Sequence, residues 1–69
     1  MMITFEVLAV SSYAGVATAL VELGRQTLRI HCAKPVLREV LDTLESVAIG
    51  RRDSSVIAEL PITLTEIGR

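Results

Sequence analysis

The chain has 69 residues, a net charge of −1 and an apolar fraction of 51%. The near-neutral charge excludes the strongly basic surface of a general nucleic-acid binder. No stretch of the sequence approaches the roughly 20 apolar residues that a membrane-spanning helix needs. With one cysteine and one histidine, the sequence also excludes an intrachain disulfide and a structural zinc site built from Cys and His ligands.

The size and hydropathy of the chain point to self-association. A domain this small buries only about 60% of the surface that its unfolded chain exposes, so its core is marginal. A mean hydropathy of +0.53 is nevertheless high for a soluble domain. We therefore expect one small α+β domain over residues 1–69, with surplus apolar surface buried between the subunits of a homo-oligomer, first of all a homodimer.

Residues 2–10 predict the first strand. From Ile3 to Ala9, every second residue is apolar, and the segment includes β-branched and aromatic side chains. The other set of alternating residues is not purely polar, because it ends in Leu8 and Val10. We expect this second face to be half covered, for example by another subunit.

The next segment is best explained as the rest of an antiparallel meander. A five-residue loop at 11–15 precedes a strand at 16–23, a short turn at 24–26 and a strand at 27–33. These runs and the 2–10 strand have nearly matched lengths, as a meander requires. Three β-branched residues of the second run favour extended structure: Val16, Thr18 and Val21.

A helix at 12–23 is the alternative interpretation. Ser11 would cap its N-terminus, Gly24 would end it, and the alanines between them favour helix. The fold would then be a two-layer β-α-β-α-β arrangement around a small parallel sheet.

The firmest element is a helix at 35–49. Its apolar residues recur at the spacing of one helical face, and Arg38 lies among the polar residues of the opposite face. Pro35 suits the first helical position, and Gly50 suits the left-handed residue just after the end. We expect this amphipathic helix to lie across one face of the sheet.

Residues 55–66 alternate again and predict a C-terminal strand. Pro61 cannot donate a backbone hydrogen bond, so this strand lies at an edge of the sheet or breaks there into two. Gly68 and Arg69 are expected to fray. The resulting order of elements is also that of a small barrel of the OB type, although no residue motif of that fold is present.

The imidazole of His31 and the thiol of Cys32 are the side chains best suited to nucleophilic or acid–base catalysis, but the two residues are adjacent on a strand. Adjacent side chains of a strand point to opposite faces, so the pair cannot act together as nucleophile and base. We expect Cys32 to be a small buried apolar residue and His31 to be a surface residue with a possible role at an interface.

Arg51 and Arg52 form the one basic cluster of the sequence, and Arg25 is the third arginine that we expect to act with them. They can contact a phosphate or an acidic partner through their guanidinium groups. The helix acids, from Glu39 to Glu45, lie opposite the apolar stripe and are expected to be solvated.

Together these observations predict a small non-enzymatic interaction or accessory protein of bacterial or phage type. We expect no catalytic residue, cofactor or metal, and binding to itself and to another protein through an apolar sheet face or a strand edge. The N-terminal apolar stretch is interrupted by Glu6 and lacks a preceding basic region, so a cytoplasmic location is expected. The alternative function is an OB-like nucleic-acid-binding module that uses Arg25, Arg51 and Arg52.

Overall fold

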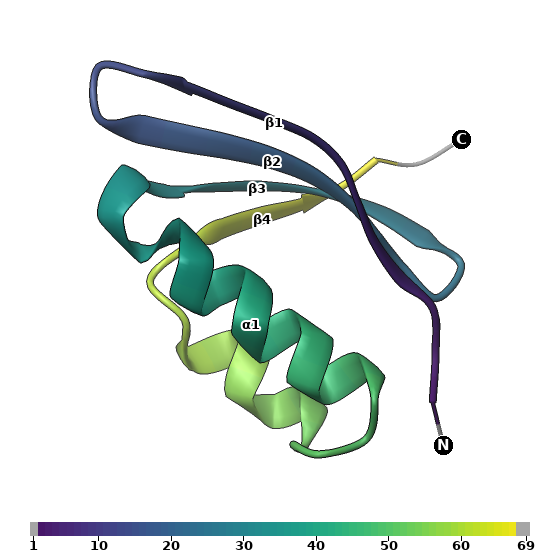
Figure 1. Ribbon diagram of the computed structural model, residues 1–69. Coiled ribbons are helices and arrows are strands. Elements are labelled where there is room, and N and C mark those ends of the chain that lie inside the picture. Colours follow the sequence, from purple (N-terminus) through teal and green to yellow (C-terminus); the bar gives the residue numbers. More distant parts are fainter. Residues whose placement is uncertain (1, 68–69) are drawn as a thin grey trace.

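The computed structural model describes residues 2–67, which form an antiparallel sheet with a helical layer on one of its faces (Figure 1). The strands lie in the order in which they follow one another in the chain. Their bounds are β1 (Phe5–Tyr13), β2 (Val16–Leu23), β3 (Gln26–Ala33) and β4 (Thr63–Glu66). The helical layer consists of the 3-10 turn η1 (Lys34–Val36), α1 (Leu37–Ala48) and the 3-10 helix η2 (Ser54–Glu59).

The predicted α+β meander is confirmed, and the alternative helix at 12–23 is wrong. β2 has the expected bounds, and β3 begins one residue earlier than expected. The C-terminal strand joins the same sheet beside β3, so the sheet has four strands rather than three. Over residues 2–67 this sheet is open, with β1 and β4 at its edges, and does not close into an OB-type barrel.

The first hairpin is tighter than the sequence predicts. We expected the strand to end at residue 10 and a loop to span 11–15, but β1 continues to Tyr13. Ala14 and Gly15 alone make the turn, with φ values of 53° and 82°. Positive φ at both central residues is the signature of a type I′ turn, whose twist matches that of the flanking strands. The two serines at 11 and 12 therefore pair with β2 instead of forming a loop.

A β-bulge at Leu8 changes which face of the sheet the end of β1 presents. Val7 lies opposite Val21 and Ala9 lies opposite Leu20, so Leu8 is an extra residue in the register. Beyond it, Val10 lies opposite the buried Ala19, on the helix side of the sheet. Strict alternation had placed Val7 and Val10 on opposite faces; the extra residue puts them on the same face.

The predicted helix is confirmed, with Pro35 in a 3-10 turn that leads directly into α1. The helix ends as expected at Gly50, whose φ is 83°. The Gly50 N–H donates to the Val47 carbonyl (3.1 Å) and the Arg51 N–H donates to the Ser46 carbonyl (2.8 Å). This is the Schellman pattern, in which a left-handed glycine closes the last turn.

The core lies between α1 and the two central strands. Alternate residues of β2 and β3 face the helix and are buried, and the helix presents a matching stripe. Ile30 of the sheet and Leu44 of the helix are the largest side chains that are fully buried in this core. The other core residues are Ala17, Ala19, Val21, Leu23, Leu28, Cys32, Val40 and Ala48.

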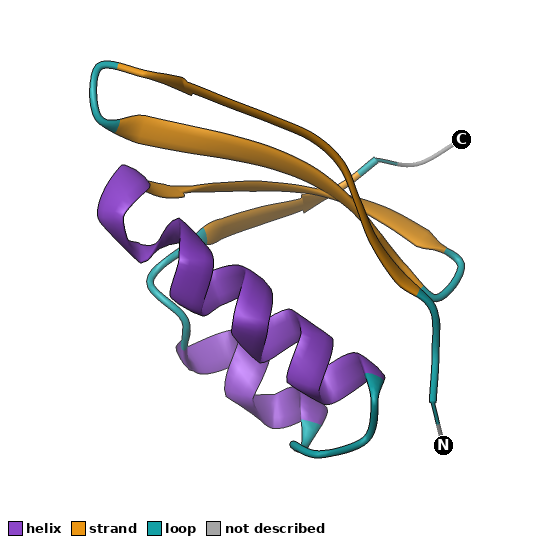
Figure 2. Ribbon diagram, in the orientation of Figure 1, coloured by secondary structure: helices purple, strands orange, loops and turns teal. Residues whose placement is uncertain are grey.

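α1 crosses the sheet diagonally. It begins directly after β3, and at its other end the Ala48 carbonyl accepts a hydrogen bond from the Ile3 N–H (2.8 Å), just before β1. The helix therefore covers the start of β1 and the end of β3 (Figure 2). Two opposite corners of the sheet lie outside its path: the end of β1, and the part of β3 and β4 near Gln26.

The predicted strand at 55–66 is wrong in its first half. Residues 54–59 form η2, and only Thr63–Glu66 pair with β3. Asp53 starts the 3-10 helix, because its carboxylate accepts the Ser55 backbone N–H (2.9 Å). Two patterns fit this segment, which explains the error: Val56, Ala58 and Leu60 alternate as in a strand, whereas Val56, Ile57 and Leu60 have helical spacing. The expected fraying of Gly68 and Arg69 concerns positions outside the described residues.

Candidate interaction surface

β1 is the long free edge of the sheet. Within residues 2–67 no strand pairs with its outer side. Tyr13 and Val16 flank the two-residue turn and so exchange the closing hydrogen bonds of the hairpin. Because hydrogen-bonded and non-hydrogen-bonded pairs alternate in an antiparallel ladder, Ser12 and Val10 direct their N–H and C=O groups away from β2. These backbone groups are available to another strand.

Side-chain exposure rises along β1. Phe5 is half-buried against the core, Val7 is 39% exposed, Val10 is 51% exposed and Tyr13 is 86% exposed. For Phe5, Val7 and Val10, which lie on the helix side, the cause is the diagonal path of α1, which covers the sheet near Phe5 and diverges from the end of β1. Tyr13 lies on the open face, opposite the helices, where no layer covers it. Leu8, in the bulge, adds a further exposed apolar side chain. The end of β1 is thus an uncovered apolar edge, and Glu6 is the strand's one charged residue.

His31 lies on the sheet face opposite the helices, as expected for the polar side of β3. Its Nδ1 atom and the Thr18 Oγ1 atom share a hydrogen bond of 3.1 Å across β2 and β3. Thr63 of β4 lies opposite it on the other side. Thr18, His31 and Thr63 therefore form a row of polar side chains across the open face, in which His31 is half-buried.

Arg25 and the arginines that follow α1 lie at one end of the molecule. The Gly24 N–H donates to the Thr4 carbonyl (2.8 Å), and Ile3 bonds to the end of α1. These bonds hold the β2–β3 turn, which contains Arg25, near the loop that contains Arg51. The sequence had left open which end of the sheet Arg25 occupies.

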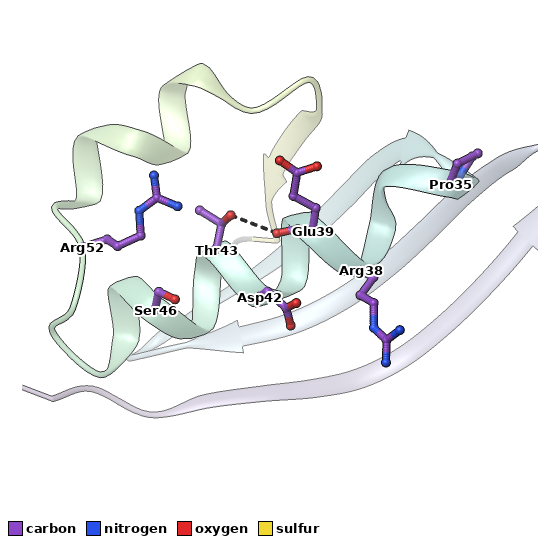
Figure 3. Close-up of a pocket in the computed structure, with 7 residues that line it drawn as sticks. All are labelled: Pro35, Arg38, Glu39, Asp42, Thr43, Ser46 and Arg52. Carbon is purple, nitrogen blue, oxygen red and sulfur yellow. Dashed lines mark hydrogen bonds between the residues drawn. The ribbon is translucent and has the colours of Figure 1, made fainter.

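Arg52 turns back over the outer surface of α1 (Figure 3). It lines a hollow of about 460 Å³ together with Glu39, Asp42 and Thr43. Thr43 is buried and donates its hydroxyl hydrogen to the Glu39 carbonyl (2.9 Å). The guanidinium group of Arg52 therefore shares its surroundings with two carboxylates, which lowers its value as a phosphate contact. The carboxylates themselves are exposed, as the sequence predicts.

An apolar groove of about 520 Å³ lies at the other corner of the sheet that α1 does not cover, between η2 and strands β3 and β4. Sequence reasoning missed it, because residues 55–60 were expected to form a strand. Its apolar walls come from Leu23, Leu28, Ile57, Ala58, Leu60, Ile62 and Leu64. Gln26 and Glu66 form a polar rim, where the Gln26 Nε2 group donates to the Glu66 carboxylate at 3.4 Å.

Cys32 is buried in the core on the helix side, as predicted. Burial raises the pKa of its thiol. A raised thiol pKa lowers the thiolate fraction and with it the nucleophilicity of the sulfur. Among residues 2–67 no group of three His, Cys, Asp or Glu side chains could hold a metal ion.

Comparison with protein-family models, with curated proteins and with solved structures finds no match for this chain. None of the helices within residues 2–67 has both the length and the apolar composition to span a membrane.

Proposed function

We propose that the chain is a small non-enzymatic interaction protein that works as a homodimer. Of the two surfaces that the sequence suggested, an apolar sheet face or a strand edge, the strand edge is the better candidate. The completed dimer would leave the sheet face that carries His31 open to a partner protein.

The observation that carries this proposal is the uncovered end of β1. Natural proteins protect long edge strands with charges, prolines or a covering segment, because free backbone groups invite pairing. From Val7 to Tyr13, β1 has no charged residue and no proline, and it exposes apolar side chains. Such an edge is stable when another strand pairs with it.

A charge placed on this edge tests the proposal. Val10→Lys introduces a protective lysine at an exposed position and should convert the dimer to a monomer in size-exclusion chromatography with light scattering. The matched control is Thr65→Lys on β4, also exposed, which should leave the dimer intact. Equal mass for the two variants and the native chain would contradict the proposal.

The alternative, a nucleic-acid-binding accessory module, has less support. It relies on Arg25, Arg51 and Arg52, and Arg52 lies in a hollow that Glu39 and Asp42 also line. Phosphate contacts would make binding fall steeply with added salt. A gel shift with single- or double-stranded oligonucleotides at low salt, lost in an Arg25→Ala and Arg51→Ala double variant, would establish this alternative.

A further inference from the structure

We propose that the partner of β1 is the β1 strand of a second copy, paired antiparallel about a two-fold axis at Ser11. The two sheets would then form one continuous sheet of eight strands, with both helices on the same side. This inference rests on the proposed function, because it names how the homodimer is built.

The backbone supports this register. Beyond the bulge, residues 9–13 pair regularly with β2. Val10 and Ser12 are the residues of this run whose N–H and C=O groups point outward. With the axis at Ser11, Val10 lies opposite Ser12 of the partner subunit, and the reverse holds by symmetry. Each of these pairs exchanges two hydrogen bonds, so no outward-facing group of the run is left without a partner.

The side chains fit the same register. On the open face, Tyr13 lies opposite the partner's Ala9, so the largest exposed side chain of β1 meets a small one. On the helix side, the two Val10 side chains become diagonal neighbours across the new strand pair, a distance at which side chains interact. The register therefore gives both exposed large apolar side chains between residues 9 and 13, Val10 and Tyr13, a neighbour on the partner subunit.

Charge also favours the antiparallel arrangement. Glu6 is the one charged residue of β1. In a parallel pair in register, the two Glu6 carboxylates would be neighbours, and like charges directly opposite are destabilising. In the antiparallel pair each Glu6 lies beyond the partner's Tyr13, at the far end of the contact.

The second copy contributes β1 rather than β4. β4 has four residues, follows Pro61 closely and includes Glu66. A β1-to-β4 contact would also be head-to-tail and would leave an edge free for further growth, whereas a β1-to-β1 contact closes at two copies. The difference between the two edges therefore selects the closed dimer.

A cysteine placed on the axis tests the geometry. Ser11 forms a non-hydrogen-bonded pair with its symmetry mate in this register, and such pairs place Cα atoms about 4.5 Å apart, within disulfide range. Ser11→Cys should form a covalent dimer under mild oxidation. Ser55→Cys, exposed on η2, is the matched control and should remain monomeric on a non-reducing gel, as should the native chain, whose Cys32 is buried.

A second pair of variants probes the backbone hydrogen bonds. Ser12→Pro removes an outward N–H without breaking the hairpin with β2, and it should weaken the dimer at least about tenfold. Glu66→Pro is the matched control on β4. The Ile67 N–H donates to the Thr27 carbonyl (2.8 Å), so by alternation the Glu66 N–H points outward too, and its loss should leave the dimer unchanged.

The outcomes separate this inference from the proposed function. A dimeric protein in which Ser11→Cys does not cross-link would overturn the β1 geometry and leave the homodimer standing. A native chain that is monomeric would overturn both. If Ser12→Pro does not fold, the cross-linking of Ser11→Cys decides the question by itself.

Discussion

The two corners of the sheet that α1 does not cover differ in how far another segment of the chain covers them. At the β3–β4 corner, η2 folds back over Leu28 and Leu64 and leaves only a groove. At the β1 corner, no segment among residues 2–67 covers Val10 on the helix side, and it remains 51% exposed. The diagonal helix leaves two corners uncovered, and η2 partly covers one of them. The other is where we expect a second chain.

The core between α1 and the centre of the sheet, which lies between the two corners, should be the most sensitive to mutation. Leu44 is fully buried against the sheet, so Leu44→Ala should lower the free energy of unfolding by about 2–5 kcal/mol. Leu41 is half-buried, so Leu41→Ala should lower the free energy of unfolding by less than Leu44→Ala does. Chemical denaturation of the two variants checks this order, and an equal loss for both would mean that the burial of the helix face is assigned wrongly.

The second largest effect is the difference in stability loss when an apolar side chain is truncated at each of the two corners. Ile57 on η2 is half-buried against the core, and Ile57→Ala should lower the free energy of unfolding by about 1–3 kcal/mol. Val10→Ala should change it by no more than about 0.5 kcal/mol, because Val10 is 51% exposed in the single chain. Both are measured by denaturation at concentrations where the chain is monomeric. A larger loss for Val10→Ala would show that the β1 corner is covered after all.

The turn that ends β1 should be open to improvement. Ala14 adopts a φ of 53°, a left-handed conformation that costs an ordinary residue about 1–2 kcal/mol. Asn tolerates this conformation, and Asn-Gly is the preferred pair in type I′ turns. Ala14→Asn should therefore raise the free energy of unfolding by about 0.5–1 kcal/mol. A thermal melt with unchanged or lower Tm would contradict the turn assignment.

The smallest expected effect concerns Cys32 at high pH. Burial raises the pKa of its thiol above the ordinary value of 9.0, so the folded chain keeps a proton that the unfolded chain releases. The stability contributed by this difference is present below about pH 9 and is lost as pH rises through the folded pKa. Cys32→Ala should remove this contribution to the fall in the free energy of unfolding at alkaline pH. Identical pH profiles of unfolding for native and variant chains would show that the thiol does not contribute.

The sequence was sufficient for the elements whose pattern has one solution. β2 and β3 alternate cleanly between buried and exposed residues, and Pro35 and Gly50 bracket the helix, so these bounds are predicted within about two residues. The end of the helix at Gly50 was predictable as well, because the left-handed conformation that ends a helix favours glycine.

The errors arose where two patterns fit equally well. Val7, Leu8, Ala9 and Val10 are all apolar, so alternation cannot reveal an extra residue among them, and the bulge was missed. The apolar residues of η2 fit a strand as well as a helical turn, and the Asp53 cap decided between them. The exposed end of β1 depends on the diagonal path of α1, which is a property of the packed fold rather than of any local segment.

In the proposed homodimer, a second copy of the chain closes the β1 edge. The mass of the native chain in solution, measured by size-exclusion chromatography with light scattering over a range of concentrations, tests this dimer. We expect a mass twice the 7.5 kDa of one chain, with dissociation on dilution. A mass of 7.5 kDa at every concentration would contradict it.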